Sequence, residues 1–421
     1  MINRRTMLQS TAAGLAGCLT SGVMAEQSTS AKLPVRTITR GPKFHWFGYY
    51  DKHQFDPGNR FVLSNEVDFE HRTPTGSDRI KVGMVDTHRN DQWIELGESR
   101  AWGWQQGCML QWVPGTQHDV IWNDREADQY VARVMNVTTG EQRTLPHPIY
   151  TVSPDGKFAL TADFARIQCM SPGYGYVGVA DPHADERAPD DSGVFKVNLA
   201  TGETTLVLSL AEMASLPFRG ASLDSHWHYF NHLLVSPDSQ RFIVLHRWRD
   251  RIPTSGDGNF TTRMITANID GSDRFVVDPS GSSSHFIWRD PQHICMWTRP
   301  VGKPAGYYLF KDQTREVERI GEGILTVNGH NTYLPATNNE WILTDTYPDS
   351  SRRQHALLYH VPTRRKVELG AFLSPPDYRG EWRCDTHPRS SRDGRLVCID
   401  SPHVGPGRQL HLIDVSGIVE A

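Results

Sequence analysis

Two kinds of tight turn alternate along the 421-residue chain, and each is flanked by short apolar stretches typical of β-strands. The first kind occurs seven times, as FDPGNRFVL from Phe55, VPGTQHDVIW from Val113, SPDGKFAL from Ser153, SPDSQRFIVL from Ser236, RDPQHICMW from Arg289, LPATNNEWIL from Leu334 and SRDGRLVCI from Ser391. The second kind lies between them, as VDTHRNDQWIEL, NVTTGEQRTL, NLATGETTLVL, NIDGSDRFVV, KDQTREVERI, HVPTRRKVEL and, at the C-terminus, IDVSGIVE. Two hairpins per repeat predict seven four-stranded antiparallel blades, and hence an all-β, seven-bladed propeller over residues 41–421. An open β-sandwich would give no reason for the two turn types to alternate without a gap.

Four long connections fall at equivalent places in this repeat. In a propeller blade the innermost strand begins, and the second strand ends, on the same face. Segments 66–79, 164–193 and 247–261 follow a second strand, and segment 209–229 precedes an innermost strand. All four are therefore predicted to lie on one face, where loops gathered on a rigid scaffold commonly build a binding cleft.

Aligning the seven first hairpins shows a recurring histidine five residues before the second residue of the turn. Blades four to seven carry His232, His285, His330 and His387, whereas blades one to three carry Asp51, Met109 and Ile149, the last followed by Tyr150. Imidazoles directed at a common axis suit a divalent metal or an anionic ligand. Asp385, two residues before His387, lies on the same strand face. The alternative is a polar channel lining whose members hydrogen-bond to one another.

The ends of the second strands supply further polar residues at the same end of the channel: Asn123, Asp124, Asp163, His246, Arg247, Arg299, Asp345 and Asp400. Such residues either satisfy one another as a solvated rim or take part in proton abstraction next to a carboxylate. In the second case a cation neutralises the acid group and acidifies the adjacent C–H, and a His or Tyr removes the proton. Tyr150 and Arg166 are a second candidate pair, although Tyr150 also suits a packing role in the channel wall.

Residues 1–25 have the pattern of an export signal, which we exclude from the fold. Arg4 and Arg5 form a twin-arginine pair before an uncharged stretch rich in Ala, Leu and Gly. Cleavage is expected either after the tripeptide VMA or within LAGC, a lipobox that would place a lipid anchor on Cys18. We therefore expect export by the twin-arginine route to the periplasm or to the membrane surface, with residues 26–40 as a linker.

Composition excludes several classes of protein. The net charge of −4 is spread evenly and forms no basic stripe, so nucleic acid is not an expected partner. Beyond the N-terminus no stretch is apolar enough to span a membrane. The cysteines after Cys18 show no CxxC pair or regular spacing, which argues against a disulfide framework. Cys295 and Cys398 lie in apolar strand patterns and are predicted to be buried free thiols.

Three motifs, FNHLLVSPD, SSHFIWRDP and CDTHPRSSRDG, resemble those of oligogalacturonate lyases, seven-bladed propellers that cleave oligouronides by β-elimination. The resemblance implies that His232 is the base and that His285, Asp385 and His387 hold a divalent metal (Mn, Ca or Zn). Asp385 departs from the family's HPHP pattern, which has a histidine there. With this reading Arg247, Arg299, His330 and Asp51 would contact a uronate-containing oligosaccharide or polysaccharide. The protein would be a monomer or small homo-oligomer.

Two other hypotheses remain open at this point. The chain is also similar to propeller lyases that act on ulvan and on rhamnose–glucuronate linkages, in which a Tyr and an Arg work without a catalytic metal. The spacing of Tyr150 and Arg166 resembles that pair. A third reading is a non-catalytic propeller that binds glycans or protein partners with the same rim, because fold alone does not fix function.

Overall fold

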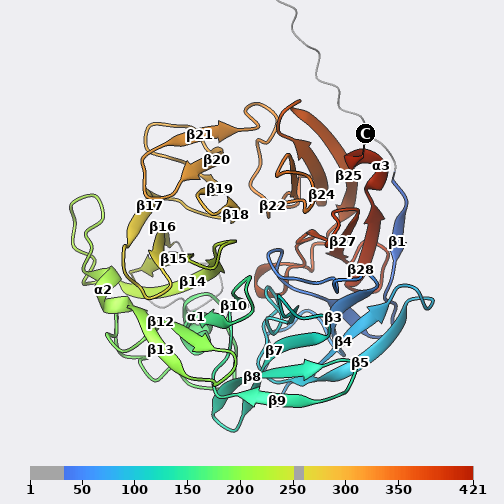
Figure 1. Ribbon diagram of the computed structural model, residues 1–421, viewed down its shortest axis with the longest axis horizontal. Helices are drawn as coiled ribbons and strands as arrows, with labels where there is room; N and C mark the ends of the chain where they lie inside the picture. Colours follow the sequence, from blue (N-terminus) through green and yellow to red (C-terminus); the bar gives the residue numbers. More distant parts are fainter. Residues whose placement is uncertain (1–32, 251–259, 421) are drawn as a thin grey trace, which may run out of the picture.

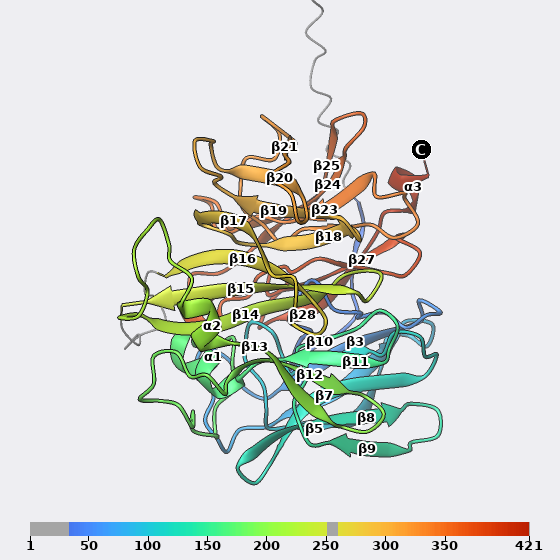
Figure 2. The ribbon, with the colours of Figure 1, turned by 60° about the vertical axis from the view of Figure 1, so that its left-hand side comes forward.

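The computed structural model describes residues 33–250 and 260–420. Its strands form seven separate four-stranded antiparallel sheets arranged around a central axis (Figure 1), which confirms the predicted seven-bladed propeller. In Figure 2, which is turned by 60°, the sheets of blades five, four, three and two lie one below another. The predicted export signal, with Cys18, lies outside the described residues.

Blades one to six follow the chain in order, each from its innermost to its outermost strand. Blades one to three contain β2 (Phe44–Trp46), β3 (Phe61–Val67), β4 (Ile80–Asp86) and β5 (Gln92–Ser99); β6 (Gln111–Trp112), β7 (Asp119–Glu126), β8 (Gln129–Asn136) and β9 (Gln142–Leu145); β10 (Thr151–Val152), β11 (Phe158–Thr161), β12 (Gly193–Asn198) and β13 (Thr204–Ser209). Blades four to six contain β14 (Trp227–Val235), β15 (Arg241–Arg249), β16 (Thr261–Asn268) and β17 (Phe275–Gly281); β18 (Phe286–Asp290), β19 (His293–Thr298), β20 (Gly306–Lys311) and β21 (Val317–Ile320); β22 (Thr332–Tyr333), β23 (Trp341–Thr344), β24 (Arg353–His360) and β25 (Arg365–Leu373).

Blade seven joins the two ends of the chain and corrects two predictions. Its strands are β26 (Arg389–Ser390), β27 (Leu396–Ser401), β28 (Gln409–Asp414) and, outermost, β1 (Val35–Thr37), which pairs with β28 in antiparallel register. Residues 35–37 are therefore part of the propeller, and the predicted linker over 26–40 is wrong for them. The predicted C-terminal hairpin is also wrong, because the chain after β28 forms α3 (Ser416–Val419). Pairing with β1 satisfies the edge that β28 would otherwise leave open.

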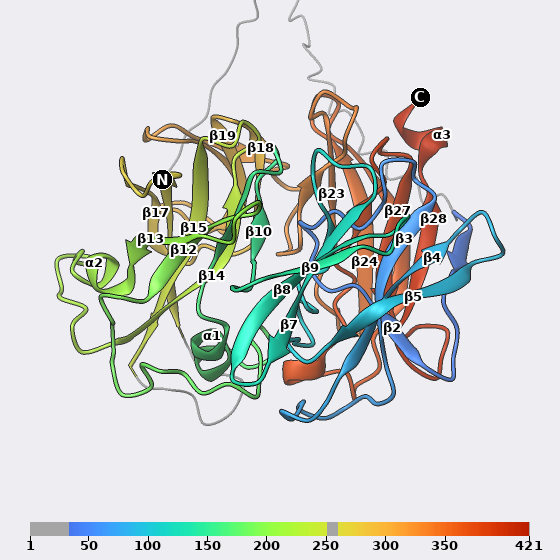
Figure 3. The same cartoon turned by 60° about the horizontal axis from the view of Figure 1, so that its bottom comes forward.

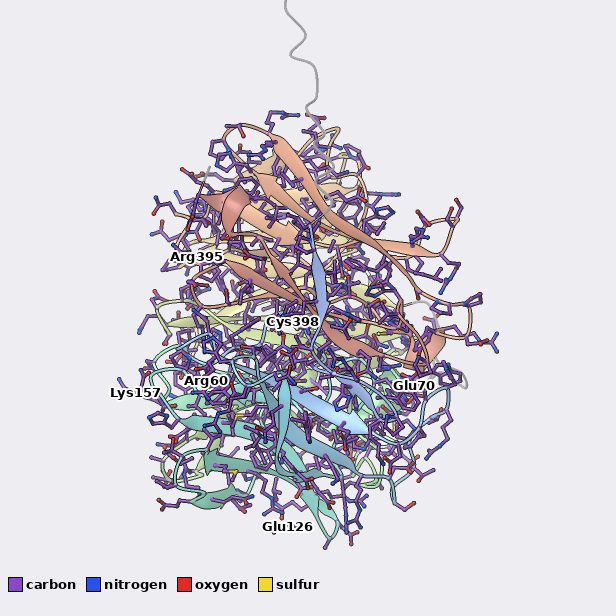
Figure 4. The ribbon with its side chains drawn as sticks, turned by 90° about the vertical axis from the view of Figure 1, so that its right-hand side faces the viewer. Arg60, Glu70, Glu126, Lys157, Arg395 and Cys398 are labelled. Carbon is purple, nitrogen blue, oxygen red and sulfur yellow. The ribbon has the colours of Figure 1, made fainter. Side chains whose placement is uncertain are left out.

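The seam between blades seven and one is reinforced by a buried ion pair. Figure 4 views this side and labels Glu70, on the connection after β3, and Cys398, on β27. Glu70 accepts a hydrogen bond of 2.6 Å from Nε of Arg408, and both side chains are almost fully buried. Cys398 and Cys295 are free and fully buried, as predicted, and burial raises each thiol's pKa to about 12.

The long connections gather on one face, as the repeat predicts. They join β3 to β4, β11 to β12 and β13 to β14, whereas residues 251–259 of the predicted connection between β15 and β16 lie outside the described residues. The second of these contains α1 (Phe164–Met170), which lies toward the bottom of Figure 3, and the third contains α2 (Leu210–Ala214). A short 3₁₀ helix, Gly380–Trp382, precedes the innermost strand of blade seven. No helix in the described part of the chain is long and apolar enough to cross a membrane.

Candidate active site

Three of the four histidines at the repeat position surround one tyrosine, Tyr49, and the fourth, His285, packs against His330. The ring centroids of His285 and His330 are 4.1 Å apart, and those of His330 and His387 are 4.2 Å apart. Tyr49 stacks on His232 at 4.9 Å and meets His387 edge-on at 5.2 Å, so it links blade four to blade seven. All four imidazoles are at most 7% exposed. The predicted histidine-lined site is therefore a single buried cluster.

Two of these histidines occupy unusual backbone conformations. His232 and His387 have φ of +53° and +38°, in the left-handed region that residues other than glycine rarely adopt. In β14 the register shifts between Asn231 and Leu233, so His232 is the extra residue of a β-bulge. A bulge redirects a side chain out of the regular alternation, and backbone strain of this kind collects at functional sites.

Three side chains form a group with the geometry of metal ligands. Ligand atoms of His330, Asp385 and His387 all lie within 4.8 Å of one another, and all three residues are buried. The Nδ1 of His330 lies 2.9 Å from Oδ1 of Asp345, which leaves its Nε2 free for a metal. This is the carboxylate–histidine arrangement that orients metal-binding imidazoles. The Nε2 of His387 is buried and has no hydrogen-bond partner in the described structure, so this atom is available to bind a metal.

Asp345 is the residue that holds this group together. Besides His330, it accepts hydrogen bonds from the backbone N–H of His387 at 3.1 Å and from the hydroxyl of Thr386 at 2.6 Å. A single carboxylate just after β23 therefore positions the segments that lead into the innermost strands of both blade six and blade seven. Its location matches the set of polar residues predicted at the ends of the second strands.

The sequence prediction placed His285 among the metal ligands and His330 among the substrate contacts, whereas the structure places His330 in the three-residue group. His285 lies beside it, and its Nδ1 is 3.0 Å from Oδ1 of Asn328. Asp385 also accepts a hydrogen bond of 2.8 Å from Nε of Arg383. Arg383 in turn donates to the hydroxyl of Tyr174 at 2.6 Å, so the connection between β11 and β12 contributes directly to the site.

His232 lies in surroundings that keep it neutral. Burial, with the nearby cation Arg247 as the next cause, lowers the pKa of His232 well below 6.5. Its Nε2 is 3.2 Å from the Tyr49 hydroxyl, and no described residue hydrogen-bonds to its Nδ1. Burial also raises the pKa of Tyr49 well above 10, so this hydroxyl stays protonated. When Nε2–H donates to Tyr49, Nδ1 carries the lone pair that can accept a proton.

Arg247 and Asp51 are partly or fully buried near this cluster, whereas Arg299 is exposed. Arg247 is 6% exposed, and its charge contributes to the lowered pKa of both His232 and His285. Asp51 pairs through Oδ2 with Lys52 at 2.8 Å, while its buried Oδ1 has no partner within the described chain. Arg299 is an exposed residue just after β19.

Tyr150 and Arg166 are not brought together, and both have their polar atoms occupied by the protein. The Tyr150 hydroxyl bonds to Gln106 and Asn231 and accepts from the backbone N–H of His232 at 2.9 Å. Arg166 donates to Asp181 and to the carbonyl oxygens of His183, Glu186, Arg187 and His228. Tyr150 therefore supports the bulge at His232, and Arg166 fastens the connection between β11 and β12.

Sequence reasoning missed several members of the site. Tyr49 and Tyr50 directly precede Asp51, so examining the residues beside the repeat position in blade one would have found them. The Tyr50 hydroxyl exchanges hydrogen bonds with the backbone of Phe286, which fixes blade five against blade one. Tyr174 and Arg383 lie outside the repeat, and no spacing rule points to them.

Fold and site together define a seven-bladed β-propeller with a buried cluster of histidines and carboxylates that has the geometry to hold a metal. No protein-family model and no curated protein matches the sequence. Among solved structures, the chain is similar to an oligogalacturonate lyase from Vibrio parahaemolyticus, with a TM-score of 0.63 and 12% identity over 91% of this chain and 94% of that one. It is also similar to an oligogalacturonate lyase in complex with manganese, with a TM-score of 0.64 and 13% identity over 94% and 97%.

A puromycin-hydrolysing peptidase from Mycobacterium tuberculosis also matches, with a TM-score of 0.52 and 12% identity. That match covers 87% of this chain but only 52% of the peptidase. The two lyases, by contrast, are matched over nearly their whole length. At these identities the similarities establish the fold.

Proposed function

We propose that this protein is a lyase that cleaves uronic-acid-containing oligosaccharides or polysaccharides by β-elimination. The observation that carries the proposal is the arrangement at Tyr49, which places a neutral histidine, His232, against a metal-capable group. β-Elimination needs these two functions, a base for the proton at C5 and positive charge on the neighbouring carboxylate. The similarity in fold to oligogalacturonate lyases supports the same reaction class.

His232 is the base in this mechanism. The C5–H bond breaks and its proton passes to Nδ1 of His232, the C4–C5 double bond forms, and the bond from C4 to O4 breaks. The departing O4 takes up a proton from water, and the hydroxide that remains takes the proton from His232, which restores the neutral base. Arg247, whose charge contributes to the lowered pKa of His232, would bind the carboxylate of the reacting residue. When the Tyr49 hydroxyl accepts from Nε2–H, this bond keeps the lone pair of His232 on Nδ1.

His330, Asp385 and His387 would hold a divalent metal. When bound, such an ion would neutralise the substrate carboxylate and so acidify the C5–H. Two imidazoles and one carboxylate suit Mn or Zn better than Ca, which prefers ligands that are all oxygen. Asp345 orients His330 for this role, and Arg383 orients Asp385. His285 lies beside His330, where a ligand or a substrate contact is equally within reach.

The twin-arginine pattern predicted in residues 1–25 supports a location outside the cytoplasm. We propose that the protein travels by the twin-arginine route and works in the periplasm or at the membrane surface. A fusion of residues 1–30 to a reporter that is active only after export would test this. Replacement of Arg4 and Arg5 by Lys should retain the reporter in the cytoplasm, and replacement of Cys18 by Ser should separate a lipid-anchored protein from a soluble one.

The decisive experiment is the incubation of the purified protein with a panel of uronate oligomers and polymers, followed by absorbance of the unsaturated uronate product. We expect product from at least one member, loss of activity after treatment with a chelator, and recovery with Mn²⁺ or Zn²⁺. No product from any member would overturn the proposal. Activity that survives exhaustive chelation would remove the metal from it.

A further inference from the structure

Blade four contains buried donors that the protein itself leaves unused. Arg247, Arg249 and Tyr229 are 6%, 4% and 1% exposed. Among the residues that the structure describes, no acceptor meets Nε of Arg247, Nε and Nη1 of Arg249 or the hydroxyl of Tyr229. Buried polar groups are nearly always paired, and an unpaired buried guanidinium is especially costly.

These donors lie on one face of the blade. Tyr229 on β14 pairs directly with Arg247 on β15, and Arg249 follows two residues later on the same strand. The guanidinium carbon of Arg249 is 6.0 Å from the Tyr229 ring centroid. The Phe260 ring lies over both arginines. Its centroid is 4.5 Å from the guanidinium carbon of Arg247 and 5.2 Å from that of Arg249. The three donor side chains therefore form one cluster, which we call the blade-four donor cluster.

On the opposite face of the same two strands the polar side chains have hydrogen-bond partners. His246 and Trp248 alternate with the two arginines along β15, and His246 bonds to His228 at 2.9 Å and accepts from Nε of Arg263 at 3.1 Å. The remaining nitrogens of Arg263 donate to backbone carbonyls of the connection that contains α2. Unpaired donors are thus confined to the face that carries Tyr229, Arg247 and Arg249.

We propose that the blade-four donor cluster binds two neighbouring carboxylates of an oligouronide: Arg247 that of the residue that reacts at His232, and Arg249 with Tyr229 that of the adjoining residue. The two guanidiniums supply only donors and the hydroxyl can supply one more. An anion with several acceptor oxygens satisfies such a set, and the planar guanidinium matches a carboxylate in particular. An anion also removes the repulsion between two neighbouring positive charges. The identity of the ligand as a uronate rests on the proposed function, whereas the anion-binding chemistry does not.

The order of these residues along the blade gives the bound chain a direction. Arg249 is the last residue of β15, Arg247 lies about 6.6 Å further in, and His232 forms the bulge of the paired strand deeper still. A uronate whose carboxylate meets Arg247 would present its C5–H to His232, and the adjoining uronate would reach Arg249 and Tyr229. Phe260, which is 42% exposed, is the side chain that must move aside to admit it.

The test compares Arg249→Gln and Tyr229→Phe with a matched control, Arg89→Gln. Arg89 is an exposed arginine on the hairpin between β4 and β5, on the opposite face of the propeller. For each protein we would measure KM and kcat on a uronate dimer and trimer, and the shift in thermal unfolding midpoint with added inorganic phosphate. We expect Arg249→Gln to raise KM at least about tenfold, Tyr229→Phe to raise it about threefold, and both to reduce the phosphate-induced shift.

The outcomes separate this inference from the proposed function. If the wild type cleaves uronates and both variants behave like Arg89→Gln, the cluster is not a subsite, although the lyase assignment stands. If the wild type cleaves no uronate, but phosphate stabilises it and not Arg249→Gln, the anion site stands and the lyase assignment falls. Tyr229→Phe removes only an unpaired hydroxyl, so it remains informative even if Arg249→Gln does not fold.

Discussion

Blades three and four both bury arginines on the face that carries the long connections, and they use them in opposite ways. Arg166, on blade three, donates to four backbone carbonyls and one carboxylate, so every part of its guanidinium is occupied. Arg247 and Arg249, on blade four, keep buried nitrogens without acceptors in the described chain. An arginine whose donors are all used by the protein fastens a loop, whereas arginines with unused buried donors can hold a ligand. Residue type and position alone do not reveal this difference.

The largest expected effect is on kcat, and it comes from replacing the proposed base in blade four, His232. His232→Ala should lower kcat by a factor of about 10²–10⁴, because it removes the group that takes the proton from C5. Tyr150→Phe, in blade three, should lower kcat by less than about tenfold, because the Tyr150 hydroxyl acts only by supporting the backbone of His232. Initial rates at saturating uronate would measure both. A comparable loss in Tyr150→Phe would move the chemistry to blade three.

Replacement of the two kinds of arginine should separate stability from binding. Arg166→Gln should cost about 3 kcal/mol in the free energy of unfolding, since several buried carbonyls lose their donor. Arg247→Gln should leave the free energy of unfolding unchanged or raise it, while KM rises about tenfold. Urea unfolding and steady-state kinetics on the same preparations would measure both. Equal losses of stability in the two variants would contradict the contrast.

A smaller effect is expected from the carboxylate that supports the metal-capable group. Asp345→Asn should weaken binding of Mn²⁺ or Zn²⁺ by about 10–100-fold, because His330 loses the partner that fixes its orientation. Calorimetric titration of the metal-free protein would measure this, with Asp349→Asn as the control. Asp349 pairs with His355 near the surface and has no contact with the cluster. Unchanged affinity in Asp345→Asn would exclude His330 as a ligand.

The smallest effect is a dependence of stability on pH. Burial lowers the pKa of His228 and of His411 to about 4, whereas in the unfolded chain both titrate near 6.5. Below pH 6.5 the unfolded state therefore takes up protons that the folded state does not, and stability falls as the pH falls toward 4. Lowering the pH from 7.5 to 5.5 should cost on the order of 1 kcal/mol for each histidine.

Urea unfolding at several pH values would show this slope, and His228→Gln should reduce it. His228 lies on the face of blade four whose polar groups are paired, so its replacement should leave KM for uronates unchanged. A rise in KM would indicate that the two faces of the blade are not independent.

The repeat was enough to predict the fold, the face that carries the long connections and the meeting of four histidines, because closure of a ring brings equivalent positions to one axis. It did not predict which histidines share a metal. That choice depends on Asp345, whose contacts cross from blade six to blade seven. Tyr174 and Arg383 were also beyond reach, since they come from segments that vary between blades. The pairing of β1 with β28 was missed because a three-residue strand at the chain end carries no turn signal.

That pairing has a consequence for how the molecule is made. Val35 lies opposite Ile413, so strands 378 residues apart in sequence complete the last blade. The first strand to be synthesised, β1, stays unpaired until the last strand, β28, has been made. Contacts between such distant segments slow folding. Between its synthesis and its pairing with β1, β28 has an open edge to which another chain can bind. The interval before ring closure is thus the period of greatest exposure to aggregation, and shortening either end of the propeller would make it permanent.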